Sequence, residues 1–175
     1  MISKNVILKN FKVKNIKTKT NIFIKKIIFK QIRDSKNVLN TLSKSYNYNY
    51  KKKNLSTLKK FKEFNLIGMG GSTLGTEAIY FFLNDKVKKK INFLNNLDNF
   101  NKINNKKSCN IIVSKSGNTL EVATNVNLFV KRNDKNLIIT ENKENYLNKI
   151  ASDLKSEVIE HKNFIGGRYS VLSEV

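Results

Sequence analysis

The sequence predicts an α/β protein built on a doubly wound, mainly parallel sheet of about five strands, preceded by a helical arm. Two observations support this fold class. From residue 64 onward, short apolar runs alternate with segments of helical periodicity. The chain has only seven glycines and no proline, and the glycines gather directly after predicted strands. Ligands of such sheets bind at the carboxyl ends of the strands, so we look for function there.

The first part of the chain predicts an arm. Residues 1–20 alternate apolar and basic side chains, which suits a short strand or an extended segment. Residues 21–45 repeat isoleucine, leucine and valine at helical spacing and predict a helix. Residues 46–54, rich in tyrosine and lysine, are interpreted as a solvated loop, although tyrosines can also stack on nucleic-acid bases. Residues 55–64 predict a short helix leading into the sheet.

The second part alternates strands and helices. The strands are expected at residues 65–69, 91–94, 109–114, 136–140 and 157–161. The intervening helices are expected at residues 71–83, 118–132 and 144–155, with a weak helix or loop at 97–105. We therefore divide the chain into a mostly helical arm, residues 1–60, and an α/β domain, residues 61–175.

The formal net charge of +21 would suit a nucleic-acid partner. Lysine supplies nearly all of this charge, however, because Arg33, Arg132 and Arg168 are the only arginines, and the lysines run through every segment. Many Lys, Asn and Ile beside few Pro, Gly, Ala and Arg is also the composition that AT-rich codons produce. We expect weak, nonspecific anion binding and no specific nucleic-acid partner.

The sole cysteine, Cys109, excludes an intrachain disulfide and fits a reducing compartment. It opens an apolar run and is interpreted as a small core residue rather than a nucleophile. The first residues lack the apolar core of a signal peptide, and Lys25 and Lys26 interrupt the only other long apolar run. We expect a cytoplasmic protein with no membrane partner.

One loop is dense in groups that bind a phosphate. It follows the predicted strand 109–114 and precedes a helix, whose first amide groups and dipole favour an anion. Gly117 lets the backbone turn, and the neighbours offer hydroxyl, amide and ammonium groups: Ser114, Lys115, Ser116, Asn118 and Thr119. We call this segment the 114–119 loop. An ordinary Ser/Asn helix cap is the alternative interpretation.

Two further glycine motifs follow predicted strands. The segment NLIGMGGSTLG contains Gly70 and Gly71, which let a ligand approach the backbone, and Ser72, which can cap a helix or bind an anion. It is not a dinucleotide-binding motif, because its pattern is G-x-G-G-S and no acidic residue ends the next strand. The last motif, GGRYSVLS, begins at Gly166 and contains Arg168.

These three motifs, in this order, resemble the glucose-6-phosphate isomerase family, whose domains are sugar isomerase (SIS) domains. The resemblance covers residues 65–175. It implies that Gly71 and Ser72 contact the sugar phosphate and that the 114–119 loop binds its phosphate. Asn118 stands where many members have threonine. Arg168 matches the arginine that stabilises an enediolate-like intermediate, a role that suits a permanently charged guanidinium.

The resemblance also implies a reaction. Members interconvert glucose 6-phosphate and fructose 6-phosphate, need no metal or cofactor, and are typically dimers, so a homodimer is possible. Their base glutamate, histidine and late lysine follow the last motif, and no residue of this chain matches them. His161, the only histidine, is expected to have a surface or strand-end role. We interpret the chain as the phosphate-binding part of a longer isomerase, its domain incomplete at the C-terminal end. The alternative is a free-standing SIS domain that binds a phosphosugar for regulation without catalysis.

Overall fold

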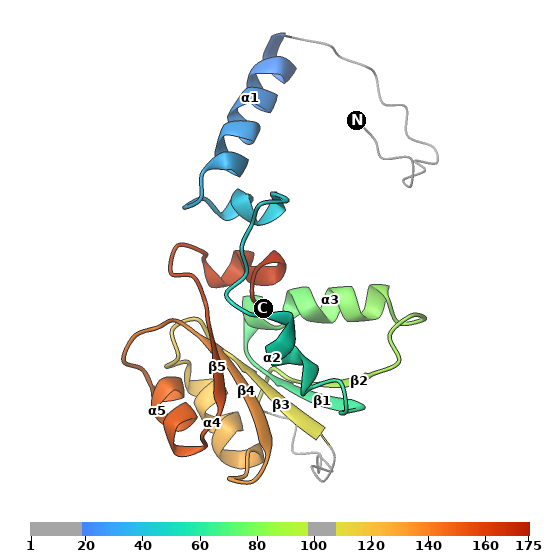
Figure 1. The fold of residues 1–175 in the computed structure, drawn as a ribbon, viewed down its shortest axis with the longest axis vertical. Coiled ribbons are helices and arrows are strands. Elements are labelled where there is room, and N and C mark those ends of the chain that lie inside the picture. The colour runs from blue at the N-terminus through green and yellow to red at the C-terminus, as the bar shows by residue number, and fades with distance from the viewer. Residues whose placement is uncertain (1–18, 98–107) are drawn as a thin grey trace.

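The computed structural model describes residues 19–97 and 108–175, and its core is a five-stranded sheet (Figure 1). The spatial order is β2-β1-β3-β4-β5, and every neighbouring pair is parallel. The strands are β1 (Glu63–Ile67), β2 (Lys90–Leu94), β3 (Ser108–Val113), β4 (Lys135–Thr140) and β5 (Glu157–Glu160). The predicted fold class is confirmed. The predictions for residues 1–18 and 98–105 lie outside the described residues.

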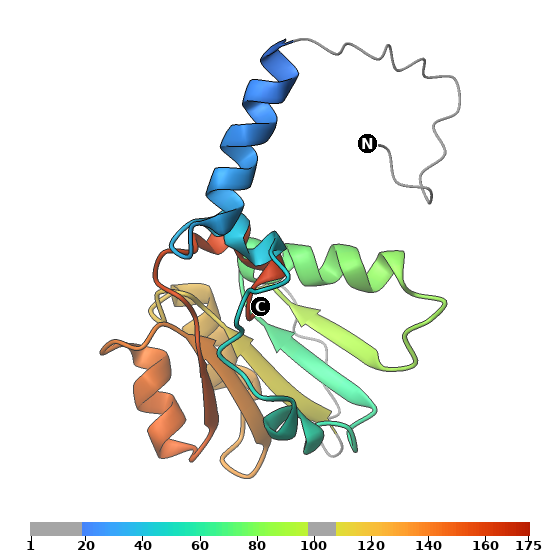
Figure 2. The ribbon, with the colours of Figure 1, turned by 45° about the horizontal axis from the view of Figure 1, so that its top comes forward.

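Helices cover both faces of this sheet (Figure 2). On one face, α4 (Leu120–Phe129) and α5 (Tyr146–Asp153) pack against a core that includes Ile67, Ile112 and Ile138. On the other face, α2 (Lys52–Ser56), α3 (Leu74–Phe82) and the last residues of the chain lie over a core that includes Leu66, Val113 and Leu137. The residues of the two cores alternate along each strand because successive side chains point to opposite faces of the sheet. Cys109 lies in the second core, as predicted, with no exposed surface.

A row of hydrogen-bonded asparagine amides, here called the ladder, crosses four strands on the same face of the sheet as the first core. Asn92 donates to Asn65 at 2.9 Å, Asn65 to Asn110 at 2.8 Å, and Asn110 to Asn136 at 2.9 Å. These residues are register partners on adjacent strands. A one-residue slip of any strand would separate the amides and leave buried donors without acceptors, so the ladder stabilises this register.

The helix predicted for residues 21–45 is shorter than expected. Helix α1 (Lys19–Arg33) ends at Arg33, and a 3₁₀ turn, η1 (Val38–Leu42), follows it. The break has a local cause, because the Asp34 side chain accepts a hydrogen bond from the Lys36 N–H and the Asn37 side chain accepts one from the Leu39 N–H. Such bonds compete with helical hydrogen bonding.

The structure confirms one prediction between residues 46 and 64 only in part, and it contradicts another. Residues 46–54 are not simply a solvated loop, because Tyr46 is buried and donates to the Glu174 carboxylate at 3.2 Å, and α2 begins at Lys52. The ammonium of Lys162 also lies 3.9 Å from the centre of the Tyr46 ring. Residues 55–64 do not form one helix, because β1 begins at Glu63, which pairs with β2 and β3 on both sides.

The remaining elements begin or end close to their predicted positions. The helix expected at 71–83 starts only at Leu74, after a 3₁₀ turn, η2 (Gly70–Ser72), in which Gly70 has a positive φ of 55°. The helices expected at 118–132 and 144–155 are shorter at both ends, as α4 and α5. The last motif forms a 3₁₀ helix, η4 (Gly167–Leu172), which contains Ser170.

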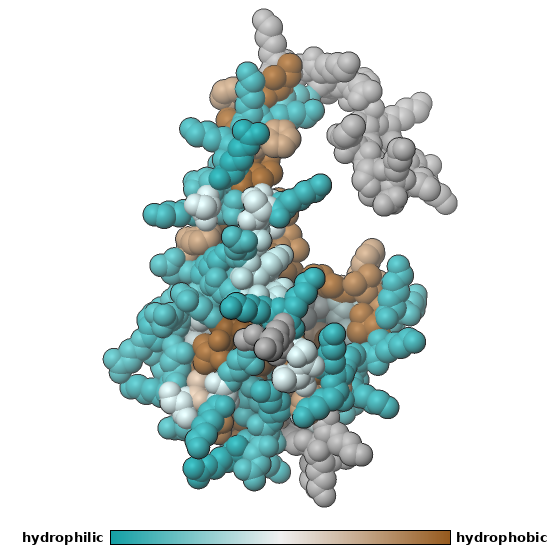
Figure 3. Space-filling model, in the orientation of Figure 1, coloured by the Kyte–Doolittle hydropathy of each residue, from teal (hydrophilic) through white to brown (hydrophobic). Residues whose placement is uncertain are grey.

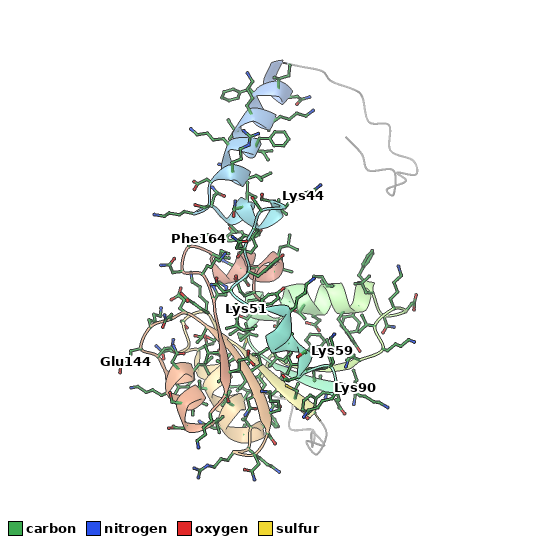
Figure 4. The ribbon with its side chains drawn as sticks, viewed as in Figure 1. Lys44, Lys51, Lys59, Lys90, Glu144 and Phe164 are labelled. Atoms are coloured by element: carbon green, nitrogen blue, oxygen red, sulfur yellow. The ribbon has the colours of Figure 1, made fainter. Side chains whose placement is uncertain are left out.

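The surface carries exposed lysines on several segments and apolar areas on two helices. Lys44, Lys51, Lys59 and Lys90 lie in different segments and their side chains project outward (Figure 4). Apolar side chains are exposed on α1, which extends away from the sheet, and on α3, among them Phe23, Phe29 and Phe82 (Figure 3). In the described part of the chain, no helix combines the length and apolar character needed to cross a bilayer. The division of the chain at residue 60 stays a prediction.

Candidate functional site

The two outer glycine motifs meet beside the carboxyl ends of the strands. Gly71 lies against the backbone of the last motif, where a Cβ atom at Gly71 would be 2.3 Å from the Gly167 carbonyl oxygen and 2.7 Å from Arg168 Cα. The Ser170 hydroxyl donates to the Gly167 carbonyl at 2.7 Å and lies 3.2 Å from the Gly71 carbonyl. Glycine at position 71 is therefore required for η2 and η4 to pack together.

The 114–119 loop turns directly after β3 and is held by its own hydroxyl groups. Ser114, only 2% exposed, accepts a hydrogen bond from the Gly117 N–H at 3.2 Å and shares one with Thr119 Oγ1 at 2.9 Å. Gly117 has φ 71°, a conformation that favours glycine. The Ser116 hydroxyl accepts from the Asn118 N–H at 3.3 Å. The glycine and serine types in this motif are thus explained by the turn itself.

Helix α4 begins at the end of this loop, and its first amide groups face the same region. Thr119 is the N-cap residue, and in the described part of the chain no side chain caps this helix. The first amides of a helix lack internal acceptors and carry the positive end of its dipole. This helix start can therefore receive an anion or a water molecule.

A cavity of about 490 Å³ opens at this point. It collects groups from η2, the 114–119 loop, α4, the segment after β4, and η4. Its lining consists of Met69, Ser72, Val113, Ser114, Lys115, Ser116, Thr119, Val122, Glu141, Lys143 and Gly167. Five residues proposed from the sequence are therefore brought together here: Ser72, Ser114, Lys115, Ser116 and Thr119.

The other four predicted site residues lie around this cavity rather than in its lining. Gly71 is partly buried and packs against the backbone of η4, and Gly117 forms the turn of the loop. The Asn118 side chain is directed toward α5, where its Oδ1 accepts from the Tyr146 N–H at 2.8 Å. Arg168 follows Gly167 and is exposed, and no ion pair of its guanidinium is found within residues 19–97 and 108–175.

The sequence analysis missed an acidic residue in the lining. Glu141 follows the end of β4, and its carboxylate lies 3.3 Å from Lys115 Nζ and 2.5 Å from Lys143 Nζ. Burial raises the pKa of Glu141, but hydrogen bonds from Lys143 and Lys115 outweigh it and hold the pKa below its usual value. Its position after a parallel strand was the signal that could have identified it.

His161 lies immediately after β5 and is only 1% exposed, so it is not a surface residue. Its Nδ1 is 2.9 Å from the Lys162 carbonyl, and its Nε2 has no hydrogen-bond partner among the described residues. Burial lowers the pKa of His161, because the charged imidazolium is poorly solvated there. Within the described ranges, no group of three or more His, Cys, Asp or Glu side chains is arranged to hold a metal ion.

The fold is that of a parallel α/β protein, and three solved structures have a similar fold. A hypothetical protein of Thermus thermophilus has a TM-score of 0.65 at 18% identity, covering 87% of this chain and 42% of that one. The Vibrio vulnificus NanR protein, solved with ManNAc-6P, has a TM-score of 0.54 at 18% identity, covering 85% and 56%. Tagatose-6-phosphate ketose/aldose isomerase from Escherichia coli has a TM-score of 0.51 at 20% identity, covering 87% and 40%. At such identities the likeness shows the fold alone.

The family follows from the sequence itself. The chain belongs to the phosphoglucose isomerase family, whose model matches residues 15–175. No curated protein sequence matches the chain. The chain spans between 40% and 56% of the length of the three similar structures.

Proposed function

We propose that this chain carries the phosphate-binding half of a glucose-6-phosphate isomerase, which interconverts glucose 6-phosphate and fructose 6-phosphate. The observation that supports it best is the cavity at the end of β3, in a chain of this family. Hydroxyl groups, an ammonium group and the uncapped start of α4 surround that cavity. A phosphate dianion is a ligand that such donors suit.

In this proposal the site residues have distinct roles. Ser114, Lys115, Ser116 and Thr119 bind the phosphate together with the first amides of α4, and Gly117 and Asn118 form the turn that places these groups. Gly71 and Ser72 bind the sugar phosphate from the η2 side. Binding at the phosphate, remote from the reacting carbons, orients those carbons for proton transfer.

Arg168 is proposed to stabilise the negative charge that develops on the substrate oxygen during proton transfer. In a form of the protein that turns over substrate, we expect Arg168→Ala to lower kcat by about a hundredfold and change KM much less. The control is Arg132→Ala, which removes the same charge from another exposed arginine. Equal effects of the two substitutions would exclude a specific role for Arg168.

We further propose that these 175 residues alone bind phosphosugars weakly without turnover, because none of the chain's glutamates matches the family's base. Glu141 lines the cavity, but its two lysine partners keep its pKa low, which makes it a poor base. The sole cysteine is buried as a free thiol, which fits the proposed cytoplasmic location.

A second candidate is a regulatory domain that binds a phosphosugar without catalysis. The similar fold of NanR, which was solved with ManNAc-6P, favours this candidate. The sequence encoded directly downstream separates the two. A continuing reading frame with the missing base supports the isomerase, and a stop codon supports the regulatory domain.

The test of either candidate is a calorimetric titration of the purified chain with fructose 6-phosphate. An oligonucleotide at the same moderate salt concentration is the comparison, because weak nonspecific binding of a basic protein is salt-sensitive. We expect saturable phosphosugar binding and no comparable oligonucleotide binding. A coupled assay that detects isomerisation by this chain alone would contradict the proposal that it binds phosphosugars without turnover. Sedimentation of the same sample tests for the homodimer.

A further inference from the structure

The first turn of α5 is bonded to the 114–119 loop. Helices ordinarily leave these amide groups without internal partners. In α5, the first three backbone N–H groups all have acceptors. Two of these acceptors belong to the 114–119 loop, and the third is the side chain of the helix's own N-cap residue. The bonds are Tyr146 N–H to Asn118 Oδ1 at 2.8 Å, Leu147 N–H to the Gly117 carbonyl at 3.1 Å, and Asn148 N–H to Asn145 Oδ1 at 2.8 Å.

The Asn145 side chain links the start of α5 to the end of β4. Its Oδ1 caps α5, and its Nδ2 donates to the Glu141 carbonyl at 3.2 Å and lies 3.3 Å from Thr140 Oγ1 at the end of β4. It is only 4% exposed. A buried amide whose donor and acceptor are both used is fixed in orientation.

The same side chain lies against the turn of the loop. A Cβ atom at Gly117 would be 2.2 Å from Asn145 Cγ and 2.3 Å from its Oδ1. The Gly117 backbone therefore packs directly on the Asn145 amide, with φ 71°. Any change in the Asn145 side chain must alter the surface on which the loop rests.

The two helix starts near the loop are used differently. The first amides of α5 are occupied by Gly117 and Asn118, so they are not available to a ligand. No described side chain caps α4, and Thr119 and Val122 of its first turn line the cavity. Helix α5 thus supports the loop, and α4 faces the ligand.

We propose that Asn145 is a positioning residue for the phosphate site: it touches no ligand, and acts through Gly117 to hold the loop's hydroxyl and amide groups in place. This inference rests on the function proposed above. Neither the glycine motifs nor the resemblance assigns a role to Asn145, which lies far along the chain from the loop. The hydrogen bonds to α5 would then couple phosphate affinity to the integrity of that helix start.

Two substitutions separate positioning from simple helix capping. Asn145→Ser keeps an oxygen that can cap α5 but removes the amide that supports Gly117, whereas Asn145→Ala removes both. The matched control is Asn37→Ala, which removes another asparagine cap, bonded to the Leu39 N–H at 2.9 Å in η1. We expect both Asn145 variants to bind fructose 6-phosphate about tenfold more weakly, because misplaced binding groups lose affinity steeply. Asn37→Ala should bind as the wild type does, and Asn145→Ser should unfold close to the wild-type temperature.

A ligand-free measurement accompanies the titration. Amide hydrogen exchange should be faster across residues 114–119 in Asn145→Ser than in the wild type, without a matching increase across η1. Wild-type affinity in Asn145→Ser, or unchanged exchange of the loop, would overturn the positioning role. If the wild type itself does not bind fructose 6-phosphate, the proposed function fails, and loop exchange alone then decides whether Asn145 positions the loop.

Discussion

Ser114→Ala is the substitution that tests the site most directly. The Ser114 hydroxyl is buried, accepts from the Gly117 N–H at 3.2 Å and shares a hydrogen bond with Thr119 Oγ1 at 2.9 Å. The Gly117 N–H also reaches the Ser114 carbonyl at 3.2 Å, so the substitution does not leave that donor without an acceptor. The folded state then loses about one hydrogen bond, worth about 1 kcal/mol. That corresponds to a melting temperature lower by about 2–4 °C in a protein of this size.

The effect on binding should be larger than the effect on stability. A hydrogen bond to a charged group contributes about 1.5–3 kcal/mol. Its loss weakens binding by about 10-fold to 100-fold. The assay is calorimetric titration with fructose 6-phosphate, combined with thermal unfolding of the same samples.

Ser108→Ala is the matched control for Ser114→Ala. Ser108 is also buried, stands at the opposite end of β3, and accepts from Asn65 Nδ2 at 3.1 Å. It should lower the melting temperature by a similar amount and leave the affinity unchanged. If Ser114→Ala retains wild-type affinity, or Ser108→Ala loses as much, the assignment of the 114–119 loop to the phosphate is refuted.

Three further predictions concern stability and titration. Gly71→Ala should cost about 1–3 kcal/mol in thermal unfolding, because its Cβ meets the η4 backbone, while Gly167→Ala, with no atom within 4 Å, should cost little; equal costs would contradict this packing. Because burial lowers the pKa of His161 in the folded state, the unfolded state binds the proton more readily, and stability should fall as pH drops below about 6.5. His161→Gln should remove that decline in unfolding titrations, and an unaltered decline would show that another group causes it. Burial also raises the pKa of the Cys109 thiol to about 11, so thiol reagents should react only as fast as the protein unfolds; rapid labelling of the native protein would contradict the buried assignment.

The contacts between distant motifs explain which residues the sequence could identify. Gly71 and Gly117 are separated by many residues from the atoms that require glycine there, Gly167 and Asn145. Their residue type indicated a close backbone contact or a special turn, because glycine is the residue that such positions require. Asn145 carries no such signal in the sequence, and Glu141 carries only its position directly after a strand, where polar residues are usually solvated loop residues. Only their burial and partners distinguish them.

The misplaced boundaries have a similar explanation. Apolar periodicity alone predicted one helix for residues 21–45, yet Asp34 and Asn37 bind nearby backbone amides and end it. Hydrogen bonds to strands on both sides extend β1 back to Glu63, into a segment with helical periodicity. Local pattern is a weak predictor where long-range pairing decides the conformation.

The sequence by itself determined the parallel α/β class, the burial of Cys109 and the three glycine motifs at the carboxyl edge. These follow from periodicity and from positions where only glycine fits. The tertiary structure alone decided that Glu141 and Lys143 line the cavity with Lys115. It also decided that α5 supports the 114–119 loop while the start of α4 faces the cavity. The physical reason is that these contacts join segments far apart in the chain, and their hydrogen-bond geometry exists only once the sheet has brought the strand ends together.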